Sequence, residues 1–172
     1  MTGGVVAFVG LGSNLAGPAR QLTRAIAALA ALPQTRLVAV SSFYRSVPIG
    51  AAARQPDFIN AVAAVQTSLT ADALLGALRT LERAARRRRT GANAPRSLDL
   101  DLLLYGPLRR RGRKLAVPHP RLHLRAFVLR PLLELSPQIA IPGRGRARKF
   151  LPRTRTQRIA RLSSFPRSTA HT

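Results

Sequence analysis

The segment Leu98-Asp99-Leu100-Asp101-Leu102-Leu103-Leu104-Tyr105 combines the clearest apolar pattern of the chain with two of its few acids. Side chains of a β-strand alternate between the two faces of a sheet. The leucines at even positions, Leu98, Leu100, Leu102 and Leu104, are therefore expected to face the core. Asp99 and Asp101 are then expected side by side on the opposite surface. The pattern predicts a strand that carries a pair of carboxylates on one face.

The segments around this strand predict an antiparallel sheet. Branched and aromatic residues predict further strands over 5–9, 37–44 and 58–67. Apolar spacing predicts helices over 18–32, 70–83 and 125–135. Gly10 and Gly12 are expected to end the first strand in a turn. The order β-α-β-β-α-β predicts an α+β fold: a ferredoxin-like βαββαβ core with extra strands, its antiparallel sheet packed between helices.

The length of 172 residues fits one domain. Apolar periodicity fades after residue 142, so we expect a folded domain over 1–142 and a weakly ordered basic C-terminal tail over 143–172. The chain has no cysteine, no apolar run long enough to span a membrane and no basic signal-like start. These features favour a cytoplasmic location without membrane association.

The charge of the chain is strongly positive, with 29 basic residues against 6 acids and a net charge of +23. Such a chain attracts polyanions, including nucleic acid and nucleotide phosphates. The arginine runs lack the interleaved aromatic residues of a base-stacking surface. We therefore expect anionic small molecules as ligands, with nucleic acid bound only non-specifically through charge.

The aspartate pair has two interpretations. One or two carboxylates together with substrate phosphates are the ligands that Mg²⁺ commonly takes. The other interpretation is a solvated strand face that is neutralised by arginines. Arg96 and the run Arg86 to Arg89 lie close in sequence, and guanidinium groups beside a metal are what phosphoryl transfer needs. The chain has no P-loop, so phosphates would be bound by side chains.

Two further groups of residues are candidates for ligand contacts. His119 lies between Pro118 and Pro120, and a turn held by two prolines can present an imidazole to a phosphate at low entropic cost. Phe58 with Asn60, together with the loop 46–50, suggests a pocket for a flat heterocycle. Both groups could equally be ordinary turn, strand and loop material.

These residues together resemble a known family, the 6-hydroxymethyl-7,8-dihydropterin pyrophosphokinases of folate biosynthesis, over roughly residues 5–142. The resemblance is carried by five blocks: Gly12-Ser13-Asn14, Ser42-Phe43-Tyr44-Arg45 through Pro48 and Gly50, Pro56-Asp57-Phe58-Ile59-Asn60, Ala94-Pro95-Arg96-Ser97-Leu98-Asp99-Leu100-Asp101, and Val117-Pro118-His119-Pro120-Arg121 through Arg125-Ala126-Phe127. The block that contains Pro95, Arg96 and the two aspartates is close to a signature.

The resemblance implies pyrophosphoryl transfer from ATP to the hydroxymethyl group of 6-hydroxymethyl-7,8-dihydropterin, which gives AMP and the pterin diphosphate. It implies two Mg²⁺ ions held by Asp99 and Asp101, with Arg87 and Arg96 as catalytic partners. It implies that ATP contacts Leu75, Glu82, Arg89, Arg96, Leu102, His119 and Arg125. The pterin pocket would be lined by Ser46, Val47, Pro48, Ile49, Phe58, Asn60 and Phe127. The enzyme would act as a monomer.

The chain also departs from the family pattern. Ala92 and Asn93 stand where a basic residue and, in some members, a stacking aromatic occur. Arg79 and Leu124 stand where amide or acidic side chains are common. The arginines of 86–89 align ambiguously by one residue. The alternatives are a catalytically dead pyrophosphokinase or a non-enzymatic nucleic-acid-binding domain of ferredoxin-like fold, which would need exposed aromatics on its central strands.

Overall fold

The order of elements along the chain matches the predicted core and extends it. The computed structural model describes residues 3–15, 17–49, 55–87 and 98–162. Its elements are β1 (Val5–Ser13), α1 (Pro18–Ala30), β2 (Thr35–Val40), β3 (Tyr44–Ser46), β4 (Phe58–Thr67), α2 (Ala71–Arg87), β5 (Asp99–Tyr105), β6 (Arg110–Arg111), β7 (Ala116–Val117), the 3-10 helix η1 (Leu122–Leu124), α3 (Ala126–Leu135), β8 (Ala140–Ile141), β9 (Gly145–Arg146), the 3-10 helix η2 (Ala147–Thr154) and β10 (Ile159–Arg161).

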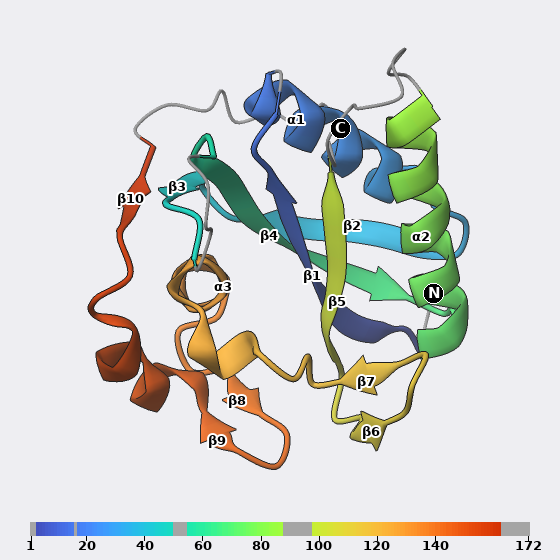
Figure 1. Ribbon diagram of the computed structural model, residues 1–172. Helices are drawn as coiled ribbons and strands as arrows, with labels where there is room; N and C mark the ends of the chain where they lie inside the picture. Colours follow the sequence, from blue (N-terminus) through green and yellow to red (C-terminus); the bar gives the residue numbers. More distant parts are fainter. Residues whose placement is uncertain (1–2, 16, 50–54, 88–97, 163–172) are drawn as a thin grey trace.

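A six-stranded sheet forms the centre of the molecule (Figure 1). Its order is β10-β3-β4-β1-β5, and β2 pairs with another part of β4. Every pairing in it is antiparallel. The central strands β1 and β4 lie between β5 on one side and β2 and β3 on the other. This is the strand arrangement of a βαββαβ core, so the predicted fold class is confirmed.

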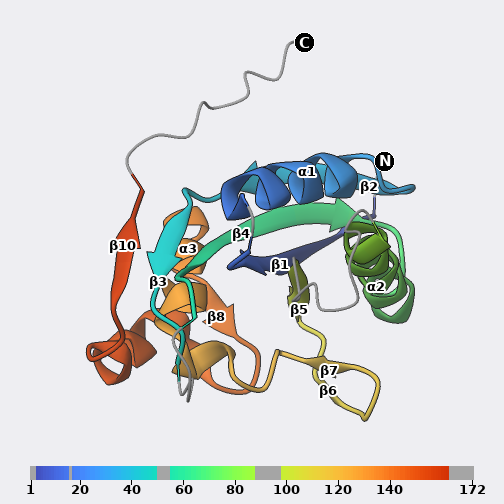
Figure 2. The same cartoon turned by 45° about the horizontal axis from the view of Figure 1, so that its top comes forward.

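Helices cover both faces of the sheet, with α1 and α2 on one face and α3 on the other (Figure 2). The face under α1 and α2 is closed by a continuous apolar core that includes Val9, Leu22, Leu29, Leu74 and Leu100. The face under α3 has a second core that includes Val62, Leu103, Leu129, Leu132 and Phe150. Across the described ranges, no helix has the length and apolar character needed to cross a membrane.

A β-bulge in β5 changes which leucines share a face. Phe8 pairs with Leu104 and Val9 pairs with Leu102, so Leu103 is the extra residue. Leu98, Leu100 and Leu102 pack in the core under α1 and α2, as predicted. Leu104 was predicted to join them but packs in the core under α3. The single extra residue reverses the alternation at this point, because side chains along a strand repeat every two residues.

The first strand is longer than predicted. Gly10 and Gly12 do not form a turn but lie within β1, which continues to Ser13. Gly10 pairs with Asp101, and Gly12 pairs with Asp99, across one edge of β1. Both glycines keep extended pairing, so their role depends on their missing side chains rather than on an unusual backbone conformation.

Residues 143–162 are part of the fold, which differs from the predicted weakly ordered tail. Gly145–Arg146 pairs with Ala140–Ile141, and η2 buries Ala147 and Phe150 against α3. The chain then returns to the sheet, where Ile159–Arg161 pairs with Tyr44–Ser46. Three buried side chains in η2 and two short strands give little apolar periodicity, which explains why the sequence pattern does not indicate a folded segment here. Residues 163–172 lie outside the described residues.

Candidate active site

A cavity of about 430 Å³ lies over β1, on the face of the sheet that also carries α3. Two cross-strand rows, Asp99–Gly12–Asn60 and Asp101–Gly10–Val62, run beneath it, and all of these residues except Asn60 line it. Because residues paired across strands share a face, the glycines leave space between the aspartates of β5 and the residues of β4. A Cβ at Gly12 would lie 2.9 Å from Asn60 Oδ1, and one at Gly10 would lie 3.4 Å from the Leu103 methyl groups. The absent side chains therefore create the hollow.

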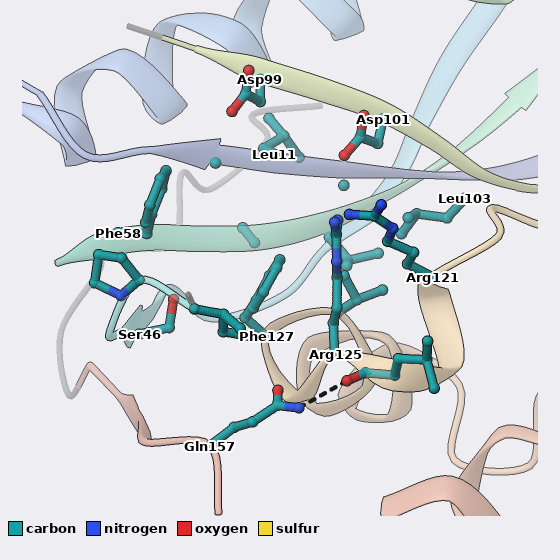
Figure 3. A pocket seen from close by; sticks show the side chains of 18 of the residues that line it. Leu11, Ser46, Phe58, Asp99, Asp101, Leu103, Arg121, Arg125, Phe127 and Gln157 are labelled. Atoms are coloured by element: carbon teal, nitrogen blue, oxygen red, sulfur yellow. Dashed lines mark hydrogen bonds between the residues drawn. The ribbon is translucent and has the colours of Figure 1, made fainter. Parts of the chain in front are cut away.

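Asp99 and Asp101 both line this cavity and are half-buried, as the alternation of β5 predicted (Figure 3). Within the described part of the chain, no group of three or more His, Cys, Asp or Glu side chains could hold a metal ion. Two carboxylates on one face nevertheless suit Mg²⁺, which commonly takes one or two protein carboxylates and completes its shell with phosphate oxygens and water. The donor set therefore fits a cation that arrives with a phosphorylated substrate.

Two arginines face the aspartate pair from the opposite wall. Arg121 and Arg125 line the cavity, and their guanidinium groups reach toward Asp101 in Figure 3. Arg125 is the residue before α3, and its Cζ atom lies 5.4 Å from the centroid of the Phe127 ring. Burial lowers the pKa of Arg125, and the charge of Asp101 opposes that shift. Arginine stays charged in proteins, so this wall supplies fixed cations.

His119 is held at the end of β5 by backbone hydrogen bonds. Its N–H donates to Leu103 O over 2.8 Å, and its Nδ1 accepts from Arg121 N over 3.1 Å. Burial lowers the pKa of His119, Asp101 opposes this, and Arg125 and Arg121 add to the lowering. The ring is therefore neutral near pH 7. Since Nδ1 accepts a hydrogen bond, the ring proton is assigned to Nε2, which is left as a donor.

The other end of the cavity is apolar. Phe58 and Phe127 project into it from β4 and α3. Val47, Pro48 and Ile49 also line it, and we call them its apolar rim because Val47 and Ile49 are exposed. Ser46 lies in the same wall and accepts a hydrogen bond of 2.7 Å from Asn60 Nδ2. Asn60 is 5% exposed and stands behind Ser46 rather than in the lining itself. An aromatic slot with a polar side of this kind suits a flat heterocycle.

Three residues expected near the nucleotide lie on the other face of the sheet. Leu102 and Leu75 pack in the core under α1 and α2. Glu82 is 7% exposed on α2, where it bonds Arg79. Burial raises the pKa of Glu82, and Arg79 opposes the shift. β5 ends the sheet on this side, so these residues could reach a ligand only around the edge of β5.

The remaining predicted arginines cannot be placed in the cavity. Arg89 and Arg96 lie outside the described residues, as do Ala92 and Asn93. Arg87 is the last residue of α2, and its side chain also lies outside the description.

The structure adds lining residues that the sequence reasoning missed. They are Gly10, Leu11, Gly12, Ala61, Val62, Leu103, Arg121, Leu124, Val128 and Gln157. Arg121 could have been found, because it follows His119 by two residues in a rigid turn. Gln157 could not, because it lies in a segment whose return to the sheet leaves no sequence signal.

The alternative of a nucleic-acid-binding sheet is not favoured. Phe43 and Tyr44 are 3% and 5% exposed, and Tyr105 OH donates to Leu69 O on the α2 side. Phe58 points into the cavity. These residues form no exposed aromatic platform of the kind that stacks on bases.

Comparisons with known proteins agree with this geometry. A family model described as 7,8-dihydro-6-hydroxymethylpterin-pyrophosphokinase (HPPK) matches residues 8–137. A 2-amino-4-hydroxy-6-hydroxymethyldihydropteridine pyrophosphokinase of Pseudomonas aeruginosa is 47% identical over 135 residues, which cover 78% of this chain and 83% of that protein. A protein of the same name from Haemophilus influenzae is 41% identical over 139 residues, covering 81% and 86% of the two chains.

Solved structures show the same fold at low identity. A crystal structure of HPPK-DHPS in complex with substrates superposes with a TM-score of 0.68 and 11% identity, covering 88% of this chain and 43% of that one. Plasmodium falciparum HPPK-DHPS with pterin and p-hydroxybenzoate gives a TM-score of 0.65 and 12% identity, covering 91% and 45%. The present chain thus spans less than half the length of these solved chains.

Proposed function

Because this chain belongs to the 7,8-dihydro-6-hydroxymethylpterin-pyrophosphokinase family, we propose that it is an ATP-dependent transferase of folate biosynthesis. It transfers a pyrophosphoryl group from ATP to the hydroxymethyl oxygen of 6-hydroxymethyl-7,8-dihydropterin. A bond forms between that oxygen and the β-phosphorus, and the bond from the β-phosphorus to the α,β-bridging oxygen breaks. The products are AMP, the pterin diphosphate and the proton of the hydroxymethyl group.

One observation carries the proposal: a single cavity joins an aromatic slot to a carboxylate pair that faces two arginines. The pterin ring would lie between Phe58 and Phe127, beside Ser46 and under the rim of Val47, Pro48 and Ile49. Asn60 would act through its hydrogen bond to Ser46. This arrangement directs the hydroxymethyl arm of the pterin toward Asp99 and Asp101, where the triphosphate is expected.

Asp99 and Asp101 would hold two Mg²⁺ ions. When bound, the ions neutralise phosphate charge and orient oxygen atoms for in-line transfer. The protein's own contribution is to keep both carboxylates on one face of a paired strand, over a floor that carries no side chain at Gly10 and Gly12. This preorganisation leaves room for the metal–phosphate complex between β5 and β4.

Arg125 and Arg121 would neutralise the triphosphate from the opposite wall, and neutral His119 would donate a hydrogen bond from Nε2 to a phosphate oxygen. Guanidinium groups suit this work because they donate in a fixed fork to two oxygens. We assign Arg96 to the transferring group because it lies in the sequence block that contains the two aspartates. Arg87 is assigned to the same group and Arg89 to ATP by their position in the family resemblance, within the run 86–89 that aligns ambiguously by one residue. Leu75, Glu82 and Leu102 would surround the nucleotide where it passes the edge of β5.

A second cleft bears on possible polyanion binding. It measures about 910 Å³ and is lined by five arginines. They are Arg109, Arg110, Arg111, Arg113 and Arg144. Among the described residues, no aromatic or acidic side chain lines it, so nucleic acid would bind there only through phosphates and without sequence preference. We propose that the enzyme acts as a monomer in the cytoplasm, where its ATP substrate is available.

The test is an assay of AMP release with ATP, Mg²⁺ and the pterin. The wild-type chain should release AMP only when the pterin is present, and Asp99→Ala should lose turnover, because the metal–triphosphate complex lacks a ligand. Asp72→Ala is the matched control, since Asp72 is 62% exposed at its side chain and pairs with surface Arg110, away from the cavity. Normal AMP release by Asp99→Ala would refute the metal assignment. Salt-sensitive nucleic-acid retardation without AMP release would favour the binding-domain alternative.

A further inference from the structure

The strand β10 and the residues just before it connect the two walls of the cavity. On one side, β10 pairs with β3, and Val47 N donates to Arg158 O over 3.3 Å. These bonds extend the ladder along the wall that carries Ser46 and the apolar rim. On the other side, Gln157 reaches the start of α3 and lines the cavity. We name residues 157–161 the strap.

Gln157 makes two hydrogen bonds that bracket Arg125. Its Oε1 accepts from Ala126 N over 2.8 Å. Its Nε2 donates to Leu124 O over 2.8 Å, the bond drawn as a dashed line in Figure 3. Arg125 between them has extended dihedrals, with φ −121° and ψ 116°. In an extended chain, the preceding C=O and the following N–H point to the same side. One carboxamide can therefore bond both and hold Arg125 in this conformation.

The start of α3 depends on this outside partner. Arg125 is the N-cap residue of α3 and makes no side-chain cap hydrogen bond. Ala126 is 3% exposed, so its N–H needs an acceptor within the protein. Gln157 supplies that acceptor from 31 residues further along the chain. The first residues of α3 include Phe127, so the same bond fixes the backbone next to both Arg125 and Phe127.

The far end of the strap is anchored independently of Gln157. Arg161 Nε donates to Ser42 Oγ over 2.9 Å, and Arg161 Nη2 lies 3.6 Å from Glu134 Oε1. Glu134 of α3 also accepts from Tyr44 OH over 2.5 Å and from Ser42 N over 2.9 Å. Burial alone would raise the pKa of Glu134, but these hydrogen bonds hold it below its usual range. A change at Gln157 should therefore leave the strap attached to the sheet.

We propose that Gln157 is a positioning residue of the proposed reaction. By bonding the backbone on both sides of Arg125, it aims the guanidinium at the triphosphate and keeps Phe127 at the pterin slot, while β10 fixes the opposite wall. This inference rests on the proposed function for its kinetic part. Its structural part, the bond from Ala126 to Gln157, can be tested on its own.

The experiment compares Gln157→Leu with Gln138→Leu. Gln138 is an exposed glutamine that accepts a hydrogen bond from Arg146 outside the cavity, so its variant removes a comparable bond elsewhere. Gln157→Leu should raise the KM for ATP and for the pterin by about tenfold. This is the effect expected when substrate binding must restore the backbone around Arg125 without roughly one net hydrogen bond. Gln138→Leu should change neither KM. Both variants should keep the wild-type far-ultraviolet circular dichroism spectrum.

Hydrogen exchange at the Ala126 amide provides the second readout. Exchange should accelerate in Gln157→Leu and stay slow in Gln157→Glu, because glutamate keeps the acceptor oxygen. Unchanged exchange in Gln157→Leu would overturn the inference, as would faster exchange with both KM values unchanged. A wild-type chain that releases no AMP would refute the proposed function alone, and the exchange data would still decide whether Gln157 holds this wall.

Discussion

The two faces of the sheet are built from the same strands but differ in what they leave open. Under α1 and α2, leucines of β5 pack in a core with these helices, and Leu29 and Leu74 are fully buried. On the other face, the neighbouring residues of β5 are aspartates and those of β1 are glycines. The core under α3 reaches only part of this face, and the cavity occupies the rest. The period of a β-strand thus lets one segment serve stability on one side and chemistry on the other.

Asp101→Asn should give the largest effect and should separate the two faces. Activity should fall on the order of 10³-fold or more, because a weakened metal–phosphate site forfeits several kcal/mol of transition-state stabilisation. The free energy of unfolding should change little, since the lost repulsion from Asp99 is offset by the lost attraction to Arg121 and Arg125. Steady-state AMP release and urea unfolding measure the two effects. A large decrease in the free energy of unfolding would mean that Asp101 stabilises the folded state and does not act in catalysis alone.

Leu29→Ala should produce the opposite pattern. Leu29 is fully buried between α1 and the sheet, so the substitution should lower the free energy of unfolding by about 2–5 kcal/mol. The KM values should stay close to those of the wild type at a temperature where the variant is folded. Urea unfolding and kinetics on the same preparation check this. A changed KM with an unchanged free energy of unfolding would contradict the assignment of stability to the face under α1 and α2.

Gly12→Ala tests whether the hollow depends on missing side chains. Its Cβ would meet Asn60 Oδ1 at 2.9 Å, and Asn60 is held by its bond to Ser46. We expect a loss of stability of about 1–3 kcal/mol from overpacking and a higher KM for the pterin. Gly76→Ala is the control on exposed α2, where a Cβ meets nothing within 4 Å. It should raise stability by about 0.5–1 kcal/mol. Equal changes in stability and in the KM for the pterin in the two variants would contradict the inference that the missing side chain of Gly12 keeps the hollow open.

The smallest effect concerns pH. Burial lowers the pKa of both His119 and His123. The unfolded chain therefore takes up protons below about pH 6.5 that the folded chain does not, so stability should fall as the pH drops from 7.5 to 5.5. His119→Gln should reduce this dependence. Melting temperatures of both proteins across this range measure it, and an unchanged slope in His119→Gln would exclude His119 as a contributor.

The candidate site was predictable where local periodicity determined it. The alternation in residues 98–102 places Asp99 and Asp101 on one face, and the structure confirms their common orientation into the cavity. Leu104 was misplaced because a bulge depends on how β1 and β5 pair, which no window of a single strand contains. Glycine next to serine and asparagine is typical of turns, so the local sequence predicts a turn at Gly10 and Gly12, where the structure has strand β1. Their role depends on the neighbours across the sheet.

The C-terminal contribution to the cavity was not predictable for a different reason. η2 buries only Ala147, Phe150 and Thr154 in eight residues, and its remaining side chains are mostly basic and exposed. Such a segment has the composition of a solvated tail. Its position depends on long-range pairing between β10 and β3 and on the two bonds of Gln157. Contacts between residues so far apart in sequence leave no local pattern.

The late position of the strap has a consequence for biosynthesis. A ribosome releases the chain from its N-terminus, so the strands β1 to β5 and the helix α3 emerge before residues 157–161. A nascent chain can thus complete both hydrophobic cores around the sheet only after η2 has emerged, and it encloses its substrate cavity later still. The competence to bind substrate therefore arises only after the scaffold that supports it has emerged.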